Sequence, residues 1–122
     1  MTTEALSEAL EEKDLRNGRI YFHTKYKSTV FNGISIGGRR SKANGERDLG
    51  TVVEITGVLS DGSEKKYDKA HHDIRLSGAG ENWLSPRADI RAWIIDRNAK
   101  VGDVVSMTRI SEFGYHIDLV RH

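Results

Sequence analysis

The chain has 122 residues and is nearly neutral, because 19 Lys and Arg residues oppose 18 Asp and Glu residues. It contains no cysteine, which excludes disulfides and thiolate metal sites and suits a reducing cytoplasm. No apolar run approaches the roughly 18 residues of a membrane-spanning helix, and the acidic first residues lack the apolar core of a signal peptide. We therefore expect one cytoplasmic domain built around a single core.

The charged residues are segregated along the sequence. Residues 1–14 carry mostly Glu, whereas residues 16–47 hold eight Lys and Arg residues against a single acid. A second basic group, which includes two histidines, occupies residues 65–75. Blocks of this kind indicate a surface for a polyanion. A solvated basic surface with no partner is the alternative.

The first half of the chain alternates short helical and extended patterns. Leu6 and Leu10 lie at helical spacing and predict a short helix over residues 4–15. Residues 18–23 predict a strand, and residues 24–31 predict a helical turn that ends in buried apolar side chains. A basic loop punctuated by glycines follows.

A hairpin occupies the middle of the sequence. Residues 51–59 predict a strand with alternating apolar positions, and residues 64–70 predict its antiparallel partner. Asp61 and Gly62 lie between them, and an Asp-Gly pair tolerates the positive φ angles that tight hairpin turns need. The stretch over residues 71–84 is irregular.

The last third combines one helix with two strands. The Ser-Pro pair at residues 85–86 is typical of a helix start, and Trp93 is expected on the buried face of that helix. The Gly-Asp turn at residues 102–103 leads into a strand over residues 103–110, and residues 115–120 alternate as another strand. The pattern predicts a mainly β fold with short helices: an open, antiparallel β-pseudobarrel of about seven strands flanked by two or three short helices.

Catalytic functions form the alternative class. Asp61, Glu64 and Lys66 loosely resemble the carboxylates and lysine of metal-dependent nucleases, but their spacing is tight and the Asp-Gly pair is explained as a turn. His71 and His72 are adjacent, so on a strand they would point to opposite faces and could not easily share a metal. We expect no catalytic residue, no metal and no cofactor. A small metal-dependent nuclease or other enzyme subunit remains the alternative.

One segment carries a resemblance to a known family. The run over residues 92–110 is AWIIDRNAKVGDVVSMTRI. It resembles the C-terminal half of B3-like DNA-binding domains, in which a short helix with an aromatic residue leads through an apolar-Gly-Asp turn into a barrel strand. Other segments resemble that family in the same order, namely GRIYFHTKYKSTVF, GTVVEITGVLSDGSEKKY and ISEFGYHIDLV. The resemblance implies a pseudobarrel over residues 16–122, preceded by an acidic helix or leader over residues 1–15.

This family includes plant transcription factors and the recognition domains of some bacterial restriction endonucleases. The resemblance implies a non-catalytic domain, expected to be monomeric, that recognises double-stranded DNA through two arms in the major groove. A nuclease or methyltransferase domain would be a natural partner. A dimeric swapped-hairpin transcription regulator is a further alternative.

The resemblance also selects candidate DNA-binding residues. They comprise a first arm, a second arm and basic residues between the arms, namely Arg16, Asn17 and Arg19; Lys66, Lys69, His71, His72 and Arg75; and Lys25, Arg39, Arg40 and Lys42. We expect Arg19 and Arg75 to reach base edges and Arg39 and Arg40 to contact phosphates. Two features depart from the family pattern: the acidic leader, and the His-His-Asp run in the second arm.

Overall fold

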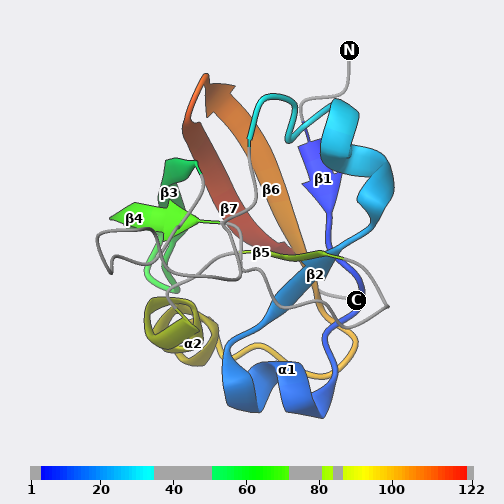
Figure 1. Cartoon of the computed structure of the whole chain (residues 1–122). Coiled ribbons are helices and arrows are strands. Elements are labelled where there is room, and N and C mark those ends of the chain that lie inside the picture. The colour runs from blue at the N-terminus through cyan, green and yellow to red at the C-terminus, as the bar shows by residue number, and fades with distance from the viewer. Residues whose placement is uncertain (1–3, 35–50, 72–80, 84–86, 121–122) are drawn as a thin grey trace, which may run out of the picture.

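The computed structural model describes residues 4–34, 51–71, 81–83 and 87–120 (Figure 1). Within these ranges strands dominate, as predicted, and none of the described helices is long and apolar enough to cross a membrane. The elements are β1 (Glu4–Leu6), α1 (Glu12–Asn17), β2 (Ile20–Phe22), the 3-10 helix η1 (Thr24–Ser28), β3 (Val52–Val58), β4 (Glu64–His71), β5 (Glu81–Trp83), α2 (Arg87–Asp96), β6 (Val104–Ser111) and β7 (Gly114–Val120).

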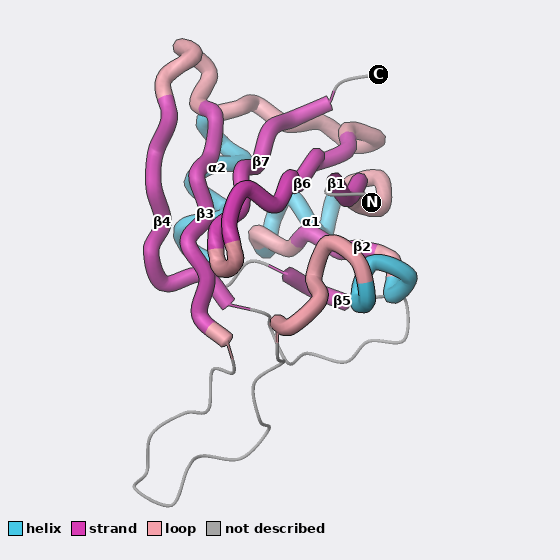
Figure 2. The backbone as a smooth tube through the Cα atoms, turned by 90° about the horizontal axis from the view of Figure 1, so that it is seen from above, coloured by secondary structure: helices cyan, strands magenta, loops and turns pink. Residues whose placement is uncertain are grey.

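Five strands form the main sheet in the order β1-β6-β7-β3-β4, and β2 pairs with β5 in a separate two-stranded sheet. The view in Figure 2 shows this order from β4 at one edge to β1 at the other. The main sheet is therefore open, as expected. It is mixed rather than antiparallel throughout, because β3 pairs with β7 in parallel. The long connection through β4, β5, α2 and β6 supplies the crossover that a parallel pair requires.

The predicted helix over residues 4–15 is wrong for its first residues. Glu4–Leu6 is a strand that pairs with β6, with Glu4 opposite Thr108. The side chain of Ala5 is buried, whereas that of Leu6 is 47% exposed, so the apolar spacing on which the helix was predicted does not mark the buried face. Pairing with a strand about a hundred residues away outweighs local propensity here.

The helix α1 begins only at Glu12. A capping box precedes it, in which the Asp14 carboxylate accepts a hydrogen bond from the Glu11 N–H and the Glu11 side chain accepts one from the Asp14 N–H. Gly18 ends the helix with a φ of 67°, a left-handed conformation that glycine adopts without strain.

The helix α2 anchors the core. Its buried side chains are Ile90, Trp93 and Ile94, and Trp93 is completely inaccessible to solvent, as predicted. The indole Nε1 donates a hydrogen bond to the Val58 carbonyl at 3.0 Å. Gly57 allows this approach, because a Cβ at that position would lie 2.9 Å from the indole ring.

The turn between α2 and β6 has the geometry expected from its sequence. Asn98 has a positive φ of 52° just after the helix, and Gly102 has one of 95°. The Asp103 carboxylate accepts a hydrogen bond from the Lys100 N–H at 2.8 Å. The same turn holds the N-terminal segment, because the Leu10 N–H donates to the Asp103 carbonyl and the Leu10 carbonyl accepts from the Gly102 N–H.

Candidate nucleic-acid interface

The turn between β6 and β7 defines one end of the molecule, which we call the turn end (top in Figure 1). The Phe113 carbonyl in this turn accepts a hydrogen bond from the Glu54 N–H at 2.8 Å, and Glu54 pairs with Gly114. Val52, two residues earlier, pairs with His71. The first residue of β3 and the last residue of β4 therefore lie beside the same turn.

The chain that precedes residue 35 also reaches the turn end. The Arg109 guanidinium, near the end of β6, donates a hydrogen bond to the Asn32 carbonyl at 2.6 Å. The Tyr115 hydroxyl donates to the Val30 carbonyl at 2.8 Å. The chain thus departs for residues 35–50, and rejoins at Val52, at the end where it leaves β4 for residues 72–80.

These two segments, together with the end of β4 beside them, carry seven of the twelve residues that the sequence selects for DNA contact. Lys69 and His71 are placed by the backbone of β4 at its turn end, although their side chains fall outside the described residues. The remaining candidates of the loop and the second arm lie outside the described residues, namely Arg39, Arg40, Lys42, His72 and Arg75.

The first predicted arm lies at the opposite end, beside α1 and α2, which we call the helix end (bottom in Figure 1). Arg16 and Asn17 are exposed in the last turn of α1. Arg19 is half-buried, and its Nε is a buried donor that has no acceptor among the described residues. Burial of the Asp14 carboxylate, close by in α1, raises the pKa of that group. Among the described residues, the first arm therefore lies at the opposite end from Val52 and His71.

Two further candidates, Lys25 and Lys66, have described side chains. Lys25 is exposed, and its Nζ lies 5.2 Å from the centre of the Tyr26 ring, beside a shallow groove of about 400 Å³ along β1. Lys66 projects from the outer face of the main sheet, where its Nζ lies 3.6 Å from a carboxylate oxygen of Glu54. Lys25 thus lies over an aromatic ring, and Lys66 lies beside a carboxylate.

The outer face of the main sheet is rich in carboxylates. Among the side chains that the structure describes, strand register and burial place six charged or titratable ones on it, namely Glu4, Glu54, Glu64, Asp118, Lys66 and His116. Because four of the six are acids, this face repels a polyanion and is a poor surface for nucleic acid.

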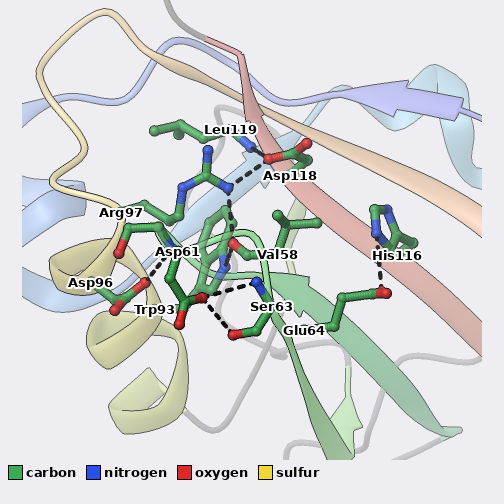
Figure 3. Close-up of polar contacts among 11 residues, drawn as sticks. Val58, Asp61, Ser63, Glu64, Trp93, Asp96, Arg97, His116, Asp118 and Leu119 are labelled. Atoms are coloured by element: carbon green, nitrogen blue, oxygen red, sulfur yellow. Dashed lines mark hydrogen bonds and ion pairs between the residues drawn. The ribbon is translucent and has the colours of Figure 1, made fainter.

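Asp61, Glu64 and Lys66, the residues that loosely resemble a nuclease site, each contact a different partner. Asp61 accepts hydrogen bonds from the Ser63 hydroxyl and from the Ser63 N–H, and these bonds lower the pKa of Asp61 (Figure 3). Glu64 faces His116 at 3.5 Å, while Lys66 faces Glu54. Across residues 4–34, 51–71, 81–83 and 87–120, no group of three or more His, Asp or Glu side chains could hold a metal ion.

A polar network at the helix end was not predicted from the sequence. The Arg97 guanidinium donates to the Val58 carbonyl at 2.8 Å and to the Asp118 carboxylate at 2.6 Å (Figure 3). Burial alone would raise the pKa of Asp118, but hydrogen bonds from Arg97 and from the Leu119 N–H outweigh it and hold that pKa below its ordinary value. Arg97 follows Trp93 by one helical turn, which is the sequence signal for this contact.

Arg109 was also missed, and its position in the sequence offered a clear signal. Val105 and Met107 are fully buried on the inner face of β6. The two-residue period of a strand places Arg109 on the same face. An arginine at an inward position of a strand needs polar partners, and the turn end supplies them.

No protein-family model matches the chain, and no curated protein matches it. Among solved structures, the chain is similar to the N-terminal domain of Helicobacter pylori LlaJI.R1, with a TM-score of 0.61 and 14% sequence identity. The similarity covers 97% of this chain and 81% of that chain. At this identity, the likeness shows a common fold.

Proposed function

We propose that this chain is a non-catalytic, B3-like domain that binds double-stranded DNA sequence-specifically and works with a bacterial restriction-modification system. The observation that carries the proposal is that the described residues flanking residues 35–50, which carry Arg39, Arg40, Lys42 and Arg47, and those preceding residues 72–80, which carry His72 and Arg75, lie together at the turn end of the fold. The acidic outer sheet face leaves that end as the surface best suited to a polyanion. LlaJI.R1, whose N-terminal domain has a similar fold, is a restriction-system protein.

The proposed contacts follow from the chemistry of the two segments. Arginine can hold guanine O6 and N7 with two hydrogen bonds, which suits Arg75 to base recognition in the major groove. Arg39, Arg40 and Lys42 suit phosphate contacts, which fix the position of the protein without specifying sequence. Arg16 and Asn17 lie at the helix end, so geometry does not favour them as contacts of the same DNA.

The proposal is tested by duplex binding in EDTA. We expect selection from a random duplex pool to yield a preferred site. Binding to that site should weaken with salt by about 0.9 in log K per log unit of salt for each neutralised phosphate, with roughly four to seven phosphates involved. Absence of binding to every duplex, or binding insensitive to salt, would remove the proposal. Cleavage of DNA after Mg²⁺ is added would favour the nuclease alternative.

A pair of charge-matched variants locates the surface. The first replaces Arg39, Arg40 and Lys42 by Gln at the turn end. The second replaces Lys13, Arg91 and Lys100, which are exposed at the helix end, by Gln. We expect the first variant to lower affinity for all duplexes and to reduce the salt dependence by about one unit per residue, while the second binds nearly as the parent does. Equal losses in both variants would show a diffuse charge effect and contradict the assigned surface.

A further inference from the structure

Arg109 joins two stretches of backbone at the turn end, residues 30–32 and residues 111–112. Its Nη1 donates to the carbonyls of Val30 at 3.3 Å and Asn32 at 2.6 Å. Its Nε donates to the Ser111 carbonyl at 3.2 Å, and its Nη2 donates to the Glu112 carbonyl. A guanidinium has five N–H groups, so these bonds leave Arg109 little capacity to contact a phosphate itself.

The ring of Tyr115 supports this arrangement. The Arg109 guanidinium lies 5.7 Å from the ring centre, and the Tyr115 hydroxyl donates to the Val30 carbonyl that Arg109 also reaches. Burial raises the pKa of Tyr115 to about 12, although the nearby arginine lowers it in part. The hydroxyl therefore keeps its proton and remains a donor at neutral pH.

The contacts of Arg109 connect the chain before residue 35 to the frame of the main sheet. The Val30–Asn32 stretch is bound by Arg109 and Tyr115, while the neighbouring turn is bound to β3 through the Phe113 carbonyl and the Glu54 N–H. The turn that Arg109 contacts also lies beside Val52 and His71, so the same contacts hold the frame from which the second arm, with the proposed base reader Arg75, leaves β4.

We propose that Arg109 is a positioning residue that sets the sequence selectivity of DNA binding while contributing little to charge-driven affinity. This inference rests on the proposed function. Base recognition depends on geometry, because a bidentate contact needs its two donors at fixed positions. Phosphate attraction tolerates small displacements, because it depends mainly on charge. Loosening the Arg109 contacts should therefore affect the selected site far more than a scrambled one.

Arg97 provides a matched control at the helix end. Its guanidinium also donates to a backbone carbonyl, that of Val58, and lies over an aromatic ring, 5.9 Å from the centre of Trp93. It is far from the departure points of residues 35–50 and 72–80 in the fold. Arg109→Lys and Arg97→Lys each keep the charge and remove the planar fork of donors.

The experiment compares the affinities of both variants for the selected duplex and for a scrambled duplex at two salt concentrations. We expect Arg109→Lys to lose about tenfold in discrimination between the two duplexes, with unchanged salt dependence and unchanged affinity for the scrambled one. Arg97→Lys should discriminate as the parent does. Tyr115→Phe, which keeps the ring and removes one bond to Val30, should shift discrimination in the same direction by less and serves if Arg109→Lys fails to fold.

Four outcomes are decisive. If the parent binds no duplex, the proposed function fails, and with it the basis of this inference. If the parent binds and Arg109→Lys discriminates equally well, the positioning role is overturned. If both duplexes weaken together and the salt dependence falls, Arg109 is a phosphate contact. If Arg97→Lys loses the same discrimination, the effect is one of stability and the inference also fails.

Discussion

The two ends of the molecule share an arginine that lies over an aromatic ring, but the two arginines bind different partners. At each end an arginine lies over a buried aromatic ring, Arg97 over Trp93 and Arg109 over Tyr115. Arg97 donates to a carboxylate and a carbonyl of the main sheet, so it closes the core against α2. Arg109 donates to backbone carbonyls of residues 30–32, which lead towards residues 35–50, and of the neighbouring β6–β7 turn. Arg97 therefore joins α2 to the main sheet, whereas Arg109 joins the chain before residue 35 to the β6–β7 turn.

The largest effect that this comparison predicts is at the helix end. Trp93→Ala should lower the free energy of unfolding by about 3–5 kcal/mol, because it removes a fully buried aromatic side chain and leaves a cavity. Urea denaturation measures this change. A variant that kept its stability but lost DNA binding would show that Trp93 contacts the DNA. The helix end could then not be assigned to stability alone.

The close approach of α2 to β3 gives the next largest effect. Gly57→Ala places a Cβ 2.9 Å from the rigid indole of Trp93, so the helix or the strand must shift. We expect a loss of about 1–3 kcal/mol in unfolding free energy. Thr56→Ala, on the outer face of the same strand, is the control and should change stability by about 0.5 kcal/mol or less. Equal stability of the two variants would show that the helix end is not closely packed.

The sequence predicted the parts of the fold that depend on local patterns. The β3–β4 hairpin, α2 with Trp93 inward and the Gly-Asp turn at residues 102–103 were all specified by nearby residues, and all are confirmed. The strand Glu4–Leu6 was not predictable in this way. Its partner in β6 lies about a hundred residues away, and its buried residue is Ala5, which carries little hydrophobic signal.

The candidate interface shows the same division. Charge segregation identified the basic segments, because charge can be counted along a chain. Which of the described flanking residues lie together could not be predicted, since this depends on the parallel pairing of β3 with β7 and on the register that sets Val52 opposite His71. Arg16 and Arg39 look alike in the sequence. Only the fold places Arg16 at the helix end, and only the fold places residues 30–32, which lead towards Arg39, at the turn end.

A smaller effect concerns the pH dependence of stability at the helix end. Hydrogen bonds from Arg97 and Leu119, set against burial, hold the pKa of Asp118 below its ordinary 3.8 in the folded state. A depressed carboxylate pKa stabilises the fold fully above about pH 4, and this contribution is lost as the pH falls through the folded pKa. Asp118→Asn should therefore be less stable than the parent at pH 7 by about 1 kcal/mol or less, because the pair is partly exposed.

That difference should shrink as unfolding is measured at successively lower pH below about 4. Glu64→Gln, on the same outer face, is the control. We expect it to change stability less than Asp118→Asn does, because the Glu64 carboxylate lies 3.5 Å from His116 and both groups are partly exposed. A stability difference between Asp118→Asn and the parent that stayed constant down to acid pH would show that the carboxylate charge does not hold Arg97. The helix end would then depend on packing alone.

The smallest expected effect separates the two ends most directly. Arg16→Gln removes one exposed positive charge at the helix end, and Arg39→Gln removes one from the segment that departs from the turn end. Loss of a phosphate contact should reduce the salt dependence of binding by about one unit, so we expect that change for Arg39→Gln. For Arg16→Gln we expect an affinity change below about twofold, because an exposed charge away from the DNA is screened by salt over about 10 Å. Titration of both variants at two salt concentrations measures the difference. If the two variants lost equal affinity and equal salt dependence, the DNA would extend across both ends, and the first arm implied by the B3-like resemblance would belong to the interface after all.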